Sequence, residues 1–195
     1  MAIPSLTMAL SRYTAVLLLF FVEYYIGHTT AHKMELDLQL IEQVGECPML
    51  NITNIRVKKY NHTVAVLNGT AQLFEDLDDR FSFRVAAAYS TLGNNQFNEY
   101  PMKIPEKTVC AVMRENYREY QHIWANYTNM PHVGADDLCP FPKGKYWVRN
   151  FAPDPSWIPP VVPQGYWRLT YDLLSEAGVI QCRLRAYMRV QRSWA

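Results

Sequence analysis

The chain has 195 residues, a net charge of +1 at neutral pH and 13% aromatic residues. So small a net charge excludes the strongly basic proteins that attract nucleic acid through a general electrostatic field, and no nucleic-acid partner is expected. The length corresponds to one domain with ample apolar material for a core.

Residues 1–31 have the features of a cleaved signal peptide. Arg12 precedes an apolar run from Ala15 to Val22, and the small residues of Thr29-Thr30-Ala31 suit signal peptidase. Cleavage after Gly27 is an alternative. We therefore expect a secreted, extracellular protein.

A membrane anchor is the competing interpretation of this segment, but a spanning helix needs about 20 apolar residues. Glu23 interrupts the run well before that length is reached. The signal peptide is therefore favoured, and the mature domain is expected to comprise residues 32–195.

Period-two alternation of apolar and polar residues dominates the mature chain and predicts antiparallel strands with one buried face. The residues that share an apolar face are Leu36, Leu38 and Leu40; Phe81, Phe83, Val85, Ala87 and Tyr89; Trp167, Leu169, Tyr171 and Leu173; and Ile180, Cys182, Leu184, Ala186, Met188 and Val190. Weaker candidate strands span 50–60, 62–74, 95–104 and 145–151, and the acidic run 75–79 is interpreted as a hairpin turn. Seven or eight short strands predict a mainly β fold, an immunoglobulin-like two-sheet antiparallel β-sandwich.

Four N-glycosylation sequons occur in the mature chain. They begin at Asn51, Asn61, Asn68 and Asn126. A single sequon arises readily by chance, but four behind a signal peptide predict that several carry glycan. The cluster between residues 51 and 70 predicts that the outer face of this region is exposed to water.

One segment departs from the strand pattern. From Lys107 to Ala125, apolar residues recur at spacings of three and four, at Cys110, Met113, Tyr117, Tyr120 and Trp124. This spacing predicts one inserted amphipathic α-helix of four to five turns. Its aromatic stripe is interpreted as packing against a sheet in preference to a ligand site.

The four cysteines, Cys47, Cys110, Cys139 and Cys182, all lie in the mature chain. An even number in an oxidising compartment predicts two disulfides, and the spacing does not choose among the three pairings. Zinc binding is the alternative, but the paired Cys-x-x-Cys spacing typical of zinc sites is missing, so no metal is expected.

A family resemblance is carried by residues 139–182. The matching positions are Cys139-Pro140 with Lys143, Tyr146 with Asn150, the proline-bearing loop 153–163, Trp167 with Leu169, and Cys182. In this order the chain resembles the ML lipid-recognition superfamily. From Lys107 through the predicted helix to Cys139, it resembles an insect-expanded, secreted branch with a helical insertion, some members of which are linked to chemosensation and pheromone response.

The resemblance implies the disulfides Cys47–Cys182 and Cys110–Cys139, and an ML-like sandwich whose sheets leave an apolar slot. The candidate pocket residues are Phe81, Phe83, Val85, Trp157, Ile158, Trp167, Leu169, Tyr171, Leu184 and Met188. The alternative is that these side chains fill the core completely. Trp157 and Ile158, in a proline-rich loop, either border the pocket mouth, contact a membrane or partner, or cap the end of the sandwich.

We therefore expect a secreted, monomeric glycoprotein that binds a lipid, sterol or hydrocarbon in a cavity between the two sheets. No cofactor and no metal are expected. A chemosensory role is implied by the resemblance alone. The alternative function is an interaction module with a filled core that modulates a membrane receptor or channel. An enzyme is not expected, because the sequence has no nucleophile elbow, zinc-protease or phosphate-loop motif.

Overall fold

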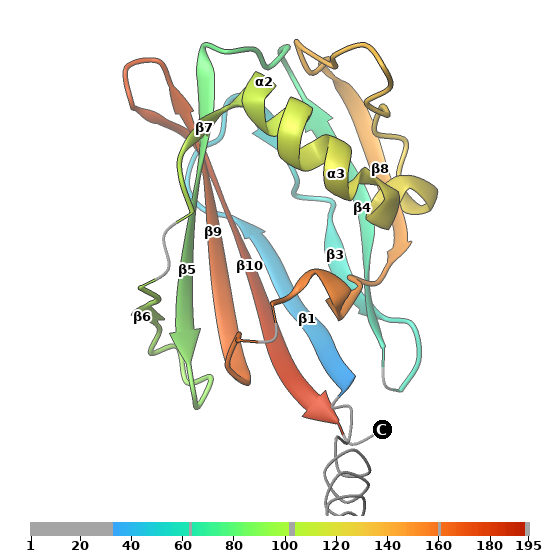
Figure 1. The fold of residues 1–195 in the computed structure, drawn as a ribbon, viewed down its shortest axis with the longest axis vertical. Helices are drawn as coiled ribbons and strands as arrows, with labels where there is room; N and C mark the ends of the chain where they lie inside the picture. Colours follow the sequence, from blue (N-terminus) through green and yellow to red (C-terminus); the bar gives the residue numbers. More distant parts are fainter. Residues whose placement is uncertain (1–32, 63, 102–103, 160, 194–195) are drawn as a thin grey trace, which may run out of the picture. The chain divides into compact units, whose positions relative to one another are not determined.

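The computed structural model describes residues 33–62, 64–101, 104–159 and 161–193 (Figure 1). Residues 34–191 form one compact unit, to which the following description applies. Of a second unit, residues 1–33 and 192–195, the described part comprises only the strand ends at 33 and 192–193. The signal peptide predicted at residues 1–31 lies outside the described residues.

Two β-sheets form the framework of the compact unit. The larger has the order β1-β10-β9-β5-β6, with β7 also paired to β5, and the smaller has the order β2-β4-β3, with β8 on the other edge of β4. The bounds in the larger sheet are β1 (Lys33–Gln43), β5 (Phe81–Ser90), β6 (Asn98–Glu99), β7 (Lys107–Thr108), β9 (Gly165–Ser175) and β10 (Ile180–Ser193). Those in the smaller sheet are β2 (Leu50–Asn51), β3 (Arg56–Lys59), β4 (Ala65–Leu73) and β8 (Gly144–Phe151). The prediction of a mainly β fold with two antiparallel sheets is confirmed.

The weaker strand predictions are only partly correct. The predicted strand 50–60 is divided into β2 and β3, and within the described residues of the predicted strand 95–104 only β6 forms. The acidic run 75–79 is not a hairpin turn, because it joins β4 of the smaller sheet to β5 of the larger one. Within that crossing, Leu77 is buried and pairs with Phe141.

The inserted helix forms as predicted, over residues 109–127. It consists of α2 (Val109–Val112), a π-helical turn (Met113–Tyr117), α3 (Arg118–Trp124) and a final 3-10 turn (Ala125–Tyr127). Thr108 caps its start, because the hydroxyl accepts a hydrogen bond from the Ala111 amide at 3.4 Å. The helix begins beside β5 and β7 and ends beside β8, so it bridges the two sheets (Figure 1).

The π-helical turn changes which residue of α3 faces the core. Tyr117 is buried as predicted, but Tyr120 is 38% exposed. Gln121 takes the inward position, donating to the Val133 carbonyl at 3.0 Å and accepting from the Val133 amide at 2.8 Å. The wider π turn explains the difference, since it advances the helix face by about one residue.

Two disulfides hold the ends of these elements together. Cys47 is bonded to Cys182, and Cys110 is bonded to Cys139. The first links the segment after β1 to β10, and the second links α2 to the segment before β8. This is the pairing that the family resemblance implies.

Candidate functional site

The inner face of the larger sheet is built from matched positions on its three central strands, β5, β9 and β10. We call each set of three directly paired residues a rung. The rungs, along the sheet, are Phe83–Leu173–Cys182, Val85–Tyr171–Leu184, Ala87–Leu169–Ala186 and Tyr89–Trp167–Met188. The candidate pocket residues of these three strands therefore share one face, as the alternation predicted.

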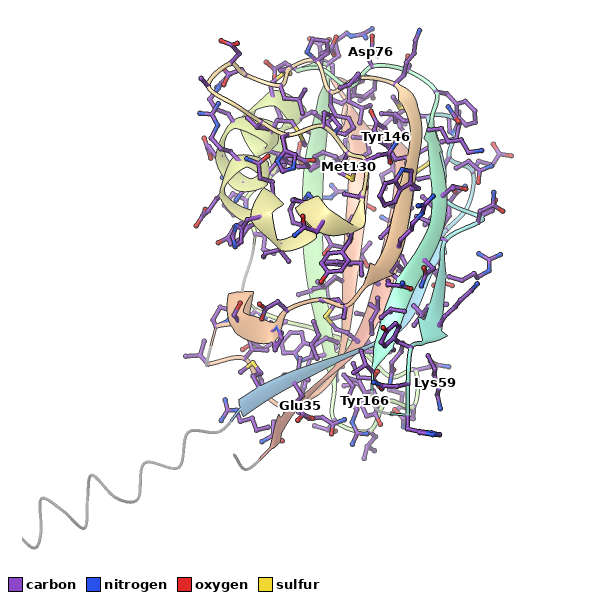
Figure 2. The ribbon with its side chains drawn as sticks, turned by 90° about the vertical axis from the view of Figure 1, so that its right-hand side faces the viewer. Glu35, Lys59, Asp76, Met130, Tyr146 and Tyr166 are labelled. Carbon is purple, nitrogen blue, oxygen red and sulfur yellow. A yellow bond between two sulfur atoms is a disulfide. The ribbon has the colours of Figure 1, made fainter. Side chains whose placement is uncertain are left out.

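The buried core divides into two separate clusters. The first, at the helix end, contains the Cys47–Cys182 disulfide, Phe81, Leu173, Tyr117 and other residues of the helix. Figure 2 shows Met130 and Tyr146, which pack against this cluster, in the half of the unit that holds the helix. The second cluster contains, among others, Leu38, Ala87, Ile158, Trp167, Ala186, Met188 and Val190.

The rung Val85–Tyr171–Leu184 lies between the two clusters, and none of its three side chains is buried. Tyr171 is 37% exposed even though β9 has a neighbouring strand on each side. A side chain at this place in a filled sandwich is normally enclosed by the opposite sheet. The adjacent inner-face residues Phe83 and Leu169 are also only half-buried.

The smaller sheet has a matching interval on β4. Leu73 belongs to the first cluster and Leu67 packs against the second. Between them, at the same alternating positions, lie Gly69 and Ala71, which are half-buried and carry almost no side chain. Between the clusters, the larger sheet thus carries unburied inner-face side chains and the smaller sheet carries small ones. We call this region the slot and define it by Phe83, Val85, Leu169, Tyr171 and Leu184 on the larger sheet and Gly69 and Ala71 on the smaller one.

The surroundings of Tyr171 are those of an interior rather than an outer surface. Desolvation by the protein atoms around it raises the pKa of its hydroxyl to about 12, so the group is neutral at physiological pH. Desolvation is the cause of that shift, while a large part of the side chain stays accessible to a water-sized probe. Protein atoms therefore crowd the Tyr171 hydroxyl, while part of its side chain stays open to contact with a further molecule.

Four of the candidate pocket residues lie in the clusters instead of the slot. Phe81 is buried in the first cluster, and Trp167, Met188 and Ile158 are buried in the second. Ile158 follows a 3-10 turn (Pro155–Trp157), and the Trp167 indole nitrogen donates to the Pro163 carbonyl at 3.1 Å. Ile158 is thus part of the second cluster. The side chain of Trp157 lies outside the described part of the structure.

Gly69 and Ala71 are the slot residues that the sequence reasoning missed. The signal was present in the series Leu67, Gly69, Ala71, Leu73, in which two small residues interrupt an apolar face. Gly69 is also required by the backbone, because its φ is +142° and a Cβ would lie 2.1 Å from the Asn54 carbonyl oxygen. The bulged segment between β2 and β3 approaches β4 at this point.

The predicted glycosylation sites differ in their surroundings. Asn51, Asn61 and Asn126 are exposed. Asn68 is half-buried on β4, where its side-chain oxygen accepts a hydrogen bond from the Asn150 amide at 3.0 Å.

The outer face of the larger sheet carries a buried acid between two arginines. Asp172 is 4% exposed and bonds to Arg183 at 2.6 Å and to Arg84 at 3.0 Å. Hydrogen bonding from Arg183, with a further contribution from Arg84, lowers the pKa of Asp172.

Figure 2 shows Asp76 at one end of the sandwich, with Lys59 and Tyr166 at the other.

Neither a metal site nor a membrane-spanning helix is found in the described part of the chain. No group of three or more histidine, cysteine or acidic side chains there could hold a metal ion. Within the same ranges, every helix is too short or too polar to traverse a bilayer.

A family model matches part of the chain. Residues 81–169 match the profile of a family described as "Protein of unknown function (DUF1091)". The matched segment runs from β5 through the helix and β8 into β9, and it includes Phe83, Val85 and Leu169 of the slot. No curated protein matches the chain.

Proposed function

We propose that this chain is a secreted, glycosylated carrier that binds a hydrophobic small molecule in the slot. The observation that supports this function is the unburied rung Val85–Tyr171–Leu184 between two buried core clusters. Apolar side chains on the inner face of a sandwich gain free energy when an apolar ligand covers them.

The slot suits a ligand held by apolar contact. An oily molecule that buries on the order of 500 Å² of apolar surface gains about 12 kcal/mol. Loss of its translational and rotational freedom costs about 4 kcal/mol or more. The remainder is close to the 8 kcal/mol or so that corresponds to micromolar affinity, so binding at this level needs no ionic contact.

The resemblance to the ML superfamily supports the same proposal. The two-sheet fold and both disulfides agree with what that resemblance implies. Disulfides are typical of proteins that fold outside the cytosol, which supports secretion. A role in chemosensation or pheromone response, by presenting the ligand to a membrane receptor or channel, extends the proposal to the insect branch. No catalytic step is proposed.

The test uses chain secreted from a eukaryotic host, extracted with organic solvent and analysed by mass spectrometry for bound lipid. In parallel, a fluorescent fatty-acid probe and a fluorescent sterol are titrated into the protein. We expect a co-purifying apolar species, or saturable probe binding at micromolar concentration.

A pair of variants ties the binding to the slot. Val85→Phe adds an aromatic ring on the inner face of β5, whereas Ala86→Phe adds one at the neighbouring, exposed position. We expect Val85→Phe to abolish probe binding without loss of stability, and Ala86→Phe to bind like the wild type. A filled core predicts the opposite for Val85→Phe, a loss of about 1–3 kcal/mol from overpacking. That result, together with no bound lipid, would favour the interaction module over the carrier.

A further inference from the structure

The hydroxyl of Tyr171 is the polar group of the slot. Its rung partners Val85 and Leu184 are apolar, as are the inner-face residues of the two adjoining rungs apart from the disulfide-bonded Cys182. Within these described rungs there is neither a cation nor a carboxylate. Tyr171 thus offers one neutral phenol in otherwise apolar surroundings.

Two other inward-facing tyrosines have hydrogen-bond partners in the protein. The hydroxyl of Tyr89 donates to the Gln164 carbonyl at 2.7 Å, and that of Tyr117 donates to the Pro131 carbonyl at 2.7 Å. The hydroxyl of Tyr171 makes no such bond with a protein group, and desolvation is the cause of its raised pKa. The Tyr171 hydroxyl is therefore available to donate a hydrogen bond to a bound molecule that supplies an acceptor atom.

We propose that Tyr171 donates a hydrogen bond to an uncharged oxygen of the bound molecule and thereby orients it in the slot. The ligand class is then a long apolar molecule with one neutral oxygen function, such as a ketone, ester or alcohol. This inference rests on the proposed function, and it narrows the lipid, sterol or hydrocarbon that the sequence suggests.

The same surroundings disfavour a free fatty acid bound with its carboxylate beside Tyr171. An ionised carboxylate loses several kcal/mol of hydration on burial and needs a cationic partner to recover it. The described rungs of the slot offer none, because the arginines of β5, β9 and β10 alternate onto the outer face with Asp172.

The test compares three ligands of equal chain length: hexadecane, 2-hexadecanone and hexadecanoate. Each competes with a fluorescent sterol bound to wild-type protein, to Tyr171→Phe or to Tyr187→Phe. Tyr187 is the matched control, since its hydroxyl lies on the outer face and donates to Glu42 at 2.9 Å.

We expect wild-type protein to bind the ketone about 2–10-fold more tightly than the alkane, the range that one neutral hydrogen bond provides. Tyr171→Phe should lose this preference, keep its affinity for the alkane and keep its melting temperature. Tyr187→Phe should retain the preference, and hexadecanoate should bind more weakly than the ketone to all three proteins.

Three results would overturn the inference. The first is equal binding of alkane and ketone to the wild-type protein. The second is a preference for the ketone that survives in Tyr171→Phe, and the third is tightest binding of hexadecanoate. Each would leave the carrier function standing, because an apolar ligand would still occupy the slot. Failure of all three ligands and of the sterol to bind would reject the carrier function as well.

Discussion

At the scale of single residues, Asp172 shows how the wet face of the larger sheet affects stability. Its carboxylate is buried between Arg183 and Arg84, which are themselves partly exposed. Its pKa is lower in the folded protein than in the unfolded chain. The ion pairs therefore stabilise the fold above the unfolded pKa of about 4, and this contribution is lost as the pH falls through the folded value.

Asp172→Asn should therefore destabilise the protein near neutral pH by about 1–2 kcal/mol, a value discounted for the exposure of both arginines. The difference from wild type should shrink as the pH falls below about 4, because the unfolded chain binds a proton there before the folded carboxylate does. Urea unfolding at pH 7 and pH 3 measures both quantities. Asp78→Asn is the control, because Asp78 pairs with Arg80 in an exposed position. An equal loss at both pH values would contradict this account.

Gly69 carries a second prediction at this scale. Alanine there meets both a backbone contact of 2.1 Å and an unfavourable φ of +142°. We expect Gly69→Ala to lower the free energy of unfolding by about 2–3 kcal/mol. Gly134→Ala is the matched control, because a Cβ at that position meets no atom within 4 Å. Denaturant unfolding should give clearly different free energies of unfolding for the two variants. Similar values would show that the backbone around residue 69 relaxes to accept the added Cβ.

At the scale of elements, the disulfide Cys110–Cys139 fixes the inserted helix. It closes 29 residues of sequence, against 135 for Cys47–Cys182. Loop-closure entropy assigns about 3.6 kcal/mol to the shorter link and about 5 kcal/mol to the longer. The double variant Cys110→Ser with Cys139→Ser should therefore lose stability but still fold, while the other double variant should lose more. Thermal unfolding would contradict this if the helix disulfide proved the more important one.

Alternation in the sequence predicted four main strands well because each has one face against the core. It failed locally in β1, where Leu40 is 45% exposed and lines a surface hollow with Glu42 and Tyr187. The helix was predicted by its spacing, but the π turn that exposes Tyr120 leaves no periodic signal in so short a segment. The hydrophobic pattern of a sequence thus identifies which face of a strand or helix is buried. It does not reveal a shift of that face by one residue, such as the one that the π turn causes.

The slot could be predicted only in part, for a physical reason. Alternation places Val85, Tyr171 and Leu184 on the inner face, but the distance to the opposite sheet depends on contacts far apart in sequence. The clusters that hold the sheets apart combine helix, loop and strand residues from Cys47 to Cys182. Gly69 and Ala71 mark the place on β4 where large side chains are missing, and their meaning becomes clear only when the neighbouring elements of the fold are known.

At the scale of the whole molecule, the buried core is divided into two clusters, with the Val85–Tyr171–Leu184 rung between them. An apolar ligand in the slot would contact residues adjoining both and make the core continuous. Because such a ligand binds the folded state alone, it stabilises that state by mass action. At a concentration 100 times the Kd, the gain is about 2.7 kcal/mol, which raises the Tm by roughly 5–10 °C for a domain of this size.

This coupling should appear in a thermal melt of the secreted protein with and without saturating 2-hexadecanone. The same ligand should slow amide hydrogen exchange in β5, β9 and β10 on both sides of the Val85–Tyr171–Leu184 rung, since it would support both clusters at once. Val85→Phe should show neither change, because its ring would occupy the slot. Protection confined to one cluster would mean that the ligand binds at one end of the sandwich and not between the two halves of the core.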